Sequence, residues 1–405
     1  MSTAAIAHKL KISLVVSDLS GQGAGRWGGA SRPFLLAQAL RRLGHEVKIY
    51  GLAFASHREV EFNTEIPMTV IPCPYYPDYR KTWTVVSELL RLLDGDILYA
   101  VKLKPSSFGI ALLKKMLGQR PLMVDIDDWE MSWYGGDDWS YGLKPKGLIQ
   151  DLFSRKGALK HIDHPLYLRW MEKLVDKADV VTRHTDFIGE RFGGVYIPSG
   201  KDVDLFDPAC YDYEASRSKY GLTPYKVLMF PGAPRPYKGV EDVLQALDIL
   251  DQPQYKLVIV GGSPYDDYDR SLTQKWGKWL INLPKTPPQQ MPEVVMAADA
   301  IVVPQQLTPA TLAQFPLKLT DAMAMAKPIL ATSVGDIPFI LAHTGYLVEP
   351  NSPPRIADAI DYIFNNFDLF EAKGKLARQR CVEYYSIDSM AHILDQILQP
   401  FLKKL

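Results

Sequence analysis

Residues 315–332 read FPLKLTDAMAMAKPILAT, a helical pattern followed directly by a short apolar strand. Pro316 suits the first helical position, where a backbone N–H has no partner within the helix. Lys327 and Pro328 end the helical pattern. The segment therefore predicts a helix that leads into a buried strand.

Lys318 and Asp321 lie three residues apart and share one face near the start of this helix. A lysine in the first turn opposes the helix dipole unless an anion binds there. A phosphate group would use both the free backbone N–H groups and the ammonium group. An exposed Lys–Asp pair of negligible energy explains the same spacing. The segment alone leaves both interpretations open.

The composition indicates a two-domain globular protein. The 405 residues exceed the usual size of a single core. Forty-six basic and 46 acidic residues cancel, so no overall charge favours nucleic acid as a partner. Three widely separated cysteines favour a reducing compartment. With no signal-peptide pattern and no run of 18 apolar residues, we expect a cytoplasmic protein.

Strands and helices alternate in two series along the chain, which predicts parallel sheets built from βαβ units. In the first half we expect strands at 11–16, 47–51, 96–101, 121–126 and 179–182, and helices at 30–43, 84–93 and 108–117. In the second half we expect strands at 227–230, 257–260 and 300–303, and helices at 240–250, 291–296 and 386–405. Loop residues at 197–208 predict the domain boundary.

A glycine-rich loop, 17–29, follows the first strand. Its letters GAGRWG at 23–28 match the dinucleotide-binding fingerprint, but several residues separate them from the strand, and the second strand lacks the acidic end that holds a ribose. Gly28 and Gly29 would instead let backbone N–H groups approach a ligand closely. A loop tip without a ligand is the alternative.

A second loop, 232–239, carries two charges, Arg235 and Lys238, and ends at a helix start. Like Lys318, these two cations lie near the N-terminal end of a helix, where a positive charge opposes the helix dipole unless an anion binds. One diphosphate would account for all three cations, with Arg235 as a planar fork and Lys238 as a point charge. Surface charges without a ligand are the alternative.

Three aspartates, Asp125, Asp127 and Asp128, follow an apolar strand at the edge of the sheet where ligands bind. Their D-x-D spacing is similar to the metal motif of metal-dependent, single-domain sugar transferases. Without further oxygen ligands, we expect Asp125 and Asp127 to cap the next turn or to bind a sugar hydroxyl. We expect no metal and no cofactor.

Residues 129–171 are rich in aromatic and basic side chains and could contact an anionic lipid headgroup or a lipid-linked acceptor. A solvated helical face explains the composition equally well. The side chains concerned are Trp129, Trp133, Trp139, Lys144, Lys146, Arg155, Lys156 and Lys160.

Along nearly the whole chain these motifs resemble the retaining sugar-nucleotide transferases of glycosyltransferase family 4, the glycosyl transferases group 1. The segments LGHEV at 43–47 and IPSGKDVDLFDP at 197–208 are similar to that family too. The resemblance implies the GT-B arrangement, with two Rossmann-like domains facing each other across a cleft. It implies an acceptor-binding domain at 1–200, a nucleotide-sugar-binding domain at 201–385, and a C-terminal helix at 386–405 that returns to the first domain.

The resemblance also implies site residues. The loop 232–239 corresponds to the family's diphosphate loop, and Asp321 falls on the second glutamate of its E-x7-E motif, the ribose ligand. The implied donor-binding residues are Gly28, Gly29, Gly232, Arg235, Lys238, Gln314, Phe315, Pro316, Leu317, Lys318 and Asp321.

Two departures from the family pattern concern the donor sugar and the acceptor. Ala313 replaces the first glutamate, and we expect Gln314, Thr311 or backbone N–H groups at 314–317 to replace its hydrogen bonds. Asp127 stands where many members carry a histidine, and an ionised carboxylate accepts hydrogen bonds but donates none.

We therefore expect a retaining, metal-independent hexosyltransferase. Its donor would be UDP-glucose, a co-substrate, and its acceptor a glycan or lipid-linked sugar in cell-envelope or exopolysaccharide synthesis. Arg235, Lys238 and Asp127 are the predicted catalytic residues, and peripheral contact with the cytoplasmic membrane stays open. The alternatives are a UDP-sugar epimerase or hydrolase on the same fold, and a non-catalytic sugar-nucleotide sensor.

Overall fold

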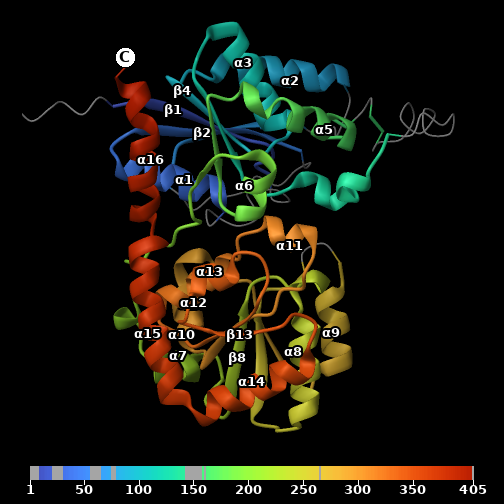
Figure 1. Cartoon of the computed structure of the whole chain (residues 1–405), viewed down its shortest axis with the longest axis vertical. Coiled ribbons are helices and arrows are strands. Elements are labelled where there is room, and N and C mark those ends of the chain that lie inside the picture. The colour runs from blue at the N-terminus through green and yellow to red at the C-terminus, as the bar shows by residue number, and fades with distance from the viewer. Residues whose placement is uncertain are drawn as a thin grey trace, which may run out of the picture. The chain divides into compact units, whose positions relative to one another are not determined.

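The computed structural model describes residues 9–20, 31–54, 65–73, 79–141, 157–158, 161–263 and 266–403 (Figure 1). The chain divides into two compact units, Met1–Ile197 with Met390–Leu405, and Pro198–Ser389. Each unit contains one parallel sheet covered by helices, so the predicted α/β fold with two βαβ series is confirmed.

The first unit has a seven-stranded sheet in the order β3-β2-β1-β4-β5-β6-β7. Its strands are β1 (Lys11–Val16), β2 (Glu46–Ala53), β3 (Met68–Pro72), β4 (Ile97–Val101), β5 (Leu122–Ile126), β6 (Val180–Arg183) and β7 (Val195–Tyr196). Its helices are α1 (Arg32–Arg42), α2 (Tyr79–Leu92), α3 (Ile110–Gly118), α5 (Pro165–Lys173) and α6 (Asp186–Phe192). Short helical turns are η2 (Pro105–Gly109), η3 (Glu130–Tyr134), η4 (Gly136–Asp138) and η5 (Val175–Lys177).

The second unit has a six-stranded sheet in the order β10-β9-β8-β11-β12-β13. Its strands are β8 (Lys226–Pro231), β9 (Tyr255–Val260), β10 (Leu280–Leu283), β11 (Ala300–Val303), β12 (Ile329–Thr332) and β13 (Tyr346–Val348). Its helices are α7 (Tyr213–Lys219), α8 (Val240–Leu250), α9 (Tyr268–Trp276), α10 (Met291–Met296), α11 (Pro309–Ala313), α12 (Leu317–Ala324), α13 (Ile337–Leu341), α14 (Pro353–Asn365) and α15 (Phe367–Tyr384). Short turns are η6 (Pro208–Cys210), η7 (Pro236–Lys238) and η8 (Pro288–Gln290).

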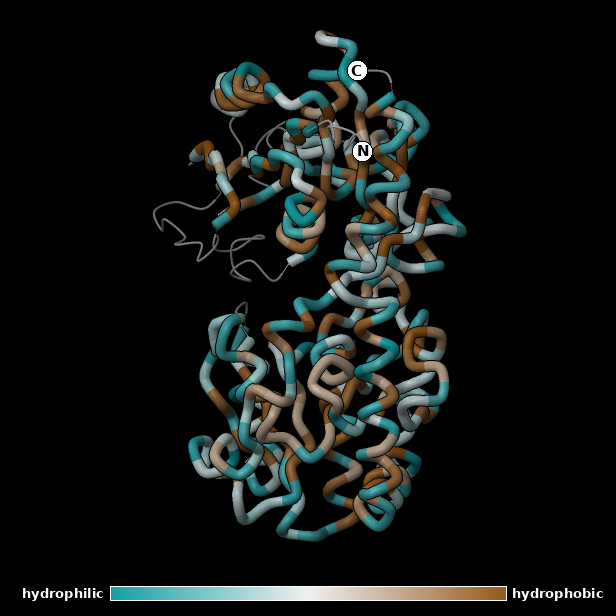
Figure 2. The backbone as a smooth tube through the Cα atoms, turned by 90° about the vertical axis from the view of Figure 1, so that its left-hand side faces the viewer, coloured by the Kyte–Doolittle hydropathy of each residue, from teal (hydrophilic) through white to brown (hydrophobic). Residues whose placement is uncertain are grey.

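The central strands are buried on both faces, as expected of parallel sheets with helices on each side. Every residue of β4, β5, β11 and β12 is buried. In the second unit, α8 and α14 cover one face of the sheet, and α10, α12 and α15 cover the other (Figure 1). Hydrophilic and hydrophobic residues alternate along the outer helices, which have one face on a sheet and one in solvent (Figure 2).

The helix expected after Phe315 is present as α12, with two differences at its ends. Pro316 is the N-cap residue rather than the first helical residue. The helix ends at Ala324, before Lys327 and Pro328, because Ala326 adopts a left-handed conformation with φ +54°. Bonds that close the turn run from Met325 N–H to Asp321 and from Lys327 N–H to Ala322.

The predicted C-terminal helix corresponds to α16 (Ile387–Leu402), and the boundary between the two units falls in its first turn. Among the described helices, none combines the length and the hydropathy needed to span a bilayer.

Candidate active site

The strand order of the second unit reverses between β8 and β11. In doubly wound sheets, ligands bind outside the carboxyl ends of the strands at this reversal. The loop after β8 is 232–239, and the chain after β11 leads through α11 into α12. All the predicted donor-binding residues of the second unit therefore lie on the two segments that flank the reversal.

The loop 232–239 is fixed in place by its glycines. Gly232 has φ +144° and Gly239 has φ +67°, a region that favours glycine. A Cβ atom on Gly239 would lie 1.8 Å from the carbonyl oxygen of Pro304, so only glycine lets the two loops pass this closely. The N–H of Gln306 donates to the carbonyl of Tyr237 at 3.0 Å and joins the same two loops.

The three predicted cations lie on these segments. Arg235 pairs with Asp266, which follows β9, at 3.1 Å, so its guanidinium is oriented by a neighbouring strand's loop. Lys318, in the first turn of α12, is 7% exposed, and its Nζ lies 4.3 Å from the centroid of the Phe230 ring. Burial, and after it the charge of the nearby Lys238, lower the pKa of Lys318 well below its ordinary value. The arrangement places Lys238 and Lys318 beside one another at the reversal point, with Arg235 at the start of the same turn.

Asp321, the predicted ribose ligand, forms an ion pair with Lys201, and the two side chains are 10% and 13% exposed. Lys201 also lies over the Phe206 ring at 4.3 Å. Its role as a partner was not predicted, although it is the one basic residue of the predicted boundary segment 197–208. That Asp321 binds the ribose stays a prediction. The Asp321 carboxylate would have to bind the ribose and Lys201 together, or exchange Lys201 for the ribose.

The structure places the side chains of Thr311 and Phe315 in contacts within the protein. The hydroxyl of Thr311 donates to the Gln306 carbonyl at 2.6 Å and takes part in a capping box with Thr308, so it cannot replace the missing glutamate at Ala313. The Phe315 side chain is buried and packs on Tyr385 with ring centroids 6.2 Å apart. Only the backbone of Phe315 is therefore left as a possible donor contact.

Gln314, Pro316 and Leu317 complete the predicted donor segment. The side chain of Gln314 is half-buried, and its N–H donates to the Thr311 carbonyl at 3.4 Å. Leu317 and Lys318 open α12, where backbone N–H groups have no acceptor within the helix. These two N–H groups and the Gln314 amide remain the candidate hydrogen-bond donors.

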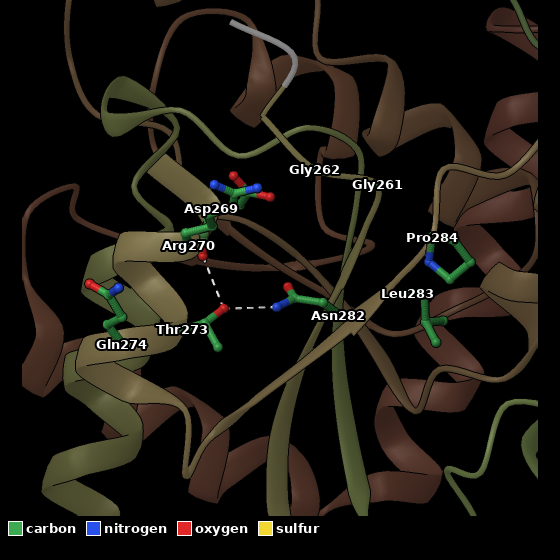
Figure 3. Close-up of a pocket in the computed structure, with 9 residues that line it drawn as sticks. All are labelled: Gly261, Gly262, Asp269, Arg270, Thr273, Gln274, Asn282, Leu283 and Pro284. Carbon is green, nitrogen blue, oxygen red and sulfur yellow. Dashed lines mark hydrogen bonds between the residues drawn. The ribbon is translucent and has the colours of Figure 1, made fainter. Parts of the chain in front are cut away.

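A pocket of about 690 Å³ lies at the carboxyl ends of β9 and β10, beside α9 (Figure 3). The Asn282 amide donates to the Thr273 hydroxyl at 2.9 Å, and that hydroxyl donates to the Asp269 carbonyl at 3.0 Å. Sequence reasoning missed this pocket, although Gly261 and Gly262 directly after a strand were its signal. The lining residues are Gly261, Gly262, Asp269, Arg270, Thr273, Gln274, Asn282, Leu283 and Pro284.

The strand order of the first unit reverses between β1 and β4. Gly28 and Gly29, from the loop after β1, lie outside the described residues. The residue after β4 is Lys102, which adopts φ +77°, a rare and strained conformation for a residue with a side chain. Its Nζ lies 2.8 Å from Glu130 and 3.6 Å from Asp127. Sequence reasoning missed Lys102, because neither its backbone strain nor its carboxylate partners appear in the local pattern.

Asp127, a predicted catalytic residue, belongs to this charged cluster at the carboxyl edge of the sheet. Its side chain is 13% exposed, and burial raises its pKa while Lys102 opposes the increase. Burial likewise raises the pKa of the adjacent Asp128 to about 6. Burial would raise the pKa of Glu130 too, but Lys102 and Lys104 outweigh it and hold the value at about 2. As a carboxylate beside Lys102, Asp127 can accept a hydrogen bond from a ligand hydroxyl.

The expectation that Asp125 caps a turn or binds a sugar is wrong. Asp125 is fully buried within β5, and its two carboxylate oxygens accept hydrogen bonds from Arg32 Nε at 2.9 Å and Arg32 Nη2 at 2.8 Å. The Thr182 hydroxyl donates to the same carboxylate at 2.7 Å. The D-x-D pair thus lacks its first metal ligand. In the part of the chain that the structure describes, no group of three or more His, Cys, Asp or Glu residues is placed to hold a metal ion.

Comparisons with known proteins match both halves of the chain. The model of the glycosyl transferase 4-like domain matches residues 28–203, and the model of glycosyl transferases group 1 matches residues 212–380. A protein of Corynebacterium glutamicum named D-inositol 3-phosphate glycosyltransferase is 30% identical over 47% of this chain and 50% of its own length. The chain thus matches only half of that relative.

A protein of Bacillus anthracis named N-acetyl-alpha-D-glucosaminyl L-malate synthase is 24% identical over 91% of this chain and 92% of its own length. The crystal structure of HepE from Anabaena in complex with UDP-glucose has a TM-score of 0.70, with 17% identity over 96% of this chain and 100% of HepE. At this identity the likeness of the two structures concerns the fold, which is of the GT-B type.

Proposed function

Because the chain belongs to the group 1 glycosyltransferases of the family 4 type, we propose that it transfers a hexose from a nucleoside diphosphate sugar to a hydroxyl group. The proposed donor is UDP-glucose, and the proposed acceptor is a glycan or a lipid-linked sugar. The observation that carries this proposal is the placement of Arg235, Lys238 and Lys318 around one sheet reversal. The complex of the similarly folded HepE with UDP-glucose supports the choice of donor.

The proposed reaction retains the configuration of the donor sugar. The acceptor oxygen forms its bond on the same face of the anomeric carbon from which the diphosphate departs, and the acceptor proton passes to a diphosphate oxygen. Arg235, Lys238 and Lys318 stabilise the charge that grows on the leaving group. The first turn of α12 adds backbone N–H groups with the same effect. Asp127 would accept a hydrogen bond from a sugar hydroxyl.

The pocket beside β9 and β10 is the proposed site of the nucleoside. Neighbouring strands lie about 4.8 Å apart, so β9 and β10 are one and two strand spacings from β8, where the diphosphate loop begins. A nucleoside spans such a distance. The polar groups of Asn282, Thr273 and Arg270 and the backbone at Leu283 would then face the base and ribose.

We expect turnover to be insensitive to EDTA. The three cations would supply the charge that a divalent ion supplies in metal-dependent transferases. The measurement is the rate of UDP release from UDP-glucose with acceptor, before and after treatment with EDTA. Strict dependence on Mg²⁺ or Mn²⁺ would contradict the proposal. The acidic cluster around Asp127 would then be the candidate metal site.

A thermal-shift panel of nucleotides and nucleotide sugars tests the donor, since a ligand that binds only the native state raises its stability. We expect the largest shifts with UDP and UDP-glucose. Product analysis without acceptor then separates the candidate reactions. Slow release of UDP supports a transferase, whereas rapid and complete conversion of the sugar nucleotide would favour the epimerase or hydrolase.

A further inference from the structure

Lys201 is fixed in place at both its backbone and its side chain. Its N–H donates to the Tyr385 carbonyl at 2.7 Å, and its own carbonyl accepts from the Ile387 N–H at 3.0 Å, so its backbone is bonded to the segment between α15 and α16. Its ammonium nitrogen lies 4.3 Å from the centroid of the Phe206 ring. The side chain is 13% exposed. Lys201 thus supplies a positive charge at a defined position.

The partner of this charge is Asp321, and the two oxygens of its carboxylate differ. Oδ1 is buried and forms the ion pair with the Lys201 ammonium group. Oδ2 accepts no hydrogen bond from any residue that the structure describes. An ionised carboxylate has lone pairs on both oxygens. The capacity of Oδ2 to accept hydrogen bonds is therefore left for a ligand.

Asp321 lies close to the proposed site of the donor diphosphate. Lys318 precedes it by one turn on the same face of α12. The Cε of Lys318 lies 4.0 Å from the place that a Cβ atom on Gly232 would occupy, so this face of the helix meets the loop 232–239. In a nucleoside diphosphate sugar, the ribose is bonded directly to the diphosphate. We therefore expect the ribose hydroxyls near Asp321.

We propose that Lys201 is a positioning residue that shares the Asp321 carboxylate with the donor ribose. The inference rests on the proposed donor site. Oδ1 keeps its ion pair with Lys201 when the donor binds, and Oδ2 accepts a hydrogen bond from a ribose hydroxyl. Because Lys201 holds one oxygen, the other is oriented before the donor arrives, and less side-chain entropy is lost on binding.

The alternative is an exchange, in which the ribose displaces Lys201 from the carboxylate. Exchange would leave a largely buried ammonium group without its partner, which is costly. Sharing and exchange predict opposite effects of removing the lysine. If the carboxylate is shared, Lys201→Met binds the donor more weakly because Asp321 is no longer oriented. If Lys201 must be displaced, the same variant binds the donor more tightly because no ion pair has to be broken.

The experiment is isothermal titration calorimetry of the full chain with UDP-glucose and with its analogues that lack the 2′ or the 3′ hydroxyl of the ribose. We expect the native protein to bind at least one analogue about tenfold or more weakly, the loss of one hydrogen bond to a charged group. Lys201→Met should bind UDP-glucose nearly as weakly as that analogue, with the affinity for the analogue unchanged. Lys201→Arg should restore part of the difference, because a guanidinium also pairs with a carboxylate.

Two further variants test whether Lys201 acts through Asp321. In an Asp321→Ala background, Lys201→Met should leave the affinity for UDP-glucose unchanged. If Asp321→Ala does not fold, the ribose and deoxyribose probes decide the question with Lys201→Met and Lys201→Arg. The matched control is Lys219→Met, which removes an exposed lysine paired with Glu293 at 2.7 Å in the same unit. It should bind all probes as the native protein does.

Each contrary result has a separate meaning. Tighter binding of UDP-glucose by Lys201→Met would show exchange and overturn sharing. An equal loss for the ribose and deoxyribose probes would show a merely structural lysine and overturn the proposal too. Equal binding of all probes by the native protein would remove Asp321 as a ribose ligand, and this proposal with it, but would leave the donor site intact. Failure of the native chain to bind UDP-glucose would overturn the proposed function itself.

Discussion

Lys238→Ala is expected to lower kcat by about 10²-fold or more, the loss typical for removal of one preorganised group that stabilises a leaving charge. Lys238 ends the turn after β8 and adjoins Lys318 at the sheet reversal. Its ammonium group would stabilise the negative charge that grows on the diphosphate oxygens as the bond to the sugar breaks. Because this charge is larger in the transition state than in the bound donor, kcat should fall more than the donor KM rises.

The matched control is Lys278→Ala in the same unit. Lys278 is 60% exposed and pairs with Asp248. It precedes β10 and so lies at the amino ends of the strands, whereas the candidate site lies at their carboxyl ends. We expect its kcat to stay within about twofold of the native value, as surface ion pairs contribute little. Steady-state kinetics with UDP-glucose and acceptor give both values. A near-normal kcat in Lys238→Ala would remove the diphosphate assignment.

The central strands and several helices of the fold could be predicted from the sequence. The elements α8, α10 and β11 begin and end where the pattern predicts, because each is a periodic or continuous apolar segment between clear turn residues. The strands that sequence reasoning missed are β3, β7, β10 and β13, the four edge strands of the two described sheets. An edge strand pairs on one side and is only partly buried, so it lacks the continuous apolar run of a central strand.

The cations of the candidate site could also be predicted, since two charges in a short loop before a helix form a local signal. Their partners could not. Asp266 reaches Arg235 because β9 lies beside β8, and Lys201 reaches Asp321 because the start of the second unit packs near α12. Such contacts depend on strand order, which local sequence does not encode. Lys102 could not be predicted for the same reason, because its carboxylate partners come from another part of the chain.

Asp125→Ala is expected to lower the free energy of unfolding by about 3–5 kcal/mol, the range for breaking one side of a buried ion pair. The Arg32 side chain is 3% exposed. Burial would lower its pKa, but Asp125 more than offsets this and raises it, so the arginine stays charged. Without Asp125, the buried arginine loses the carboxylate that contributes most to keeping it charged. Thr182 also loses its carboxylate acceptor, and the Tyr99 hydroxyl, 2.7 Å from Thr182, is affected in turn.

Urea titration of the full chain, with a separate transition fitted for each unit, measures this loss. The exposed pair Lys177–Asp176, 59% and 68% exposed, is the control, and Asp176→Ala should change stability by about 1 kcal/mol or less. The double variant Arg32→Met, Asp125→Ala removes both charges and should recover part of the lost stability, because no buried arginine charge is then left without its carboxylate. If Asp125→Ala is as stable as the native protein, the pair is not what holds β5 to α1, and Asp125 returns as a candidate ligand. The double variant separates these cases, since only a structural pair predicts that the second substitution rescues the first.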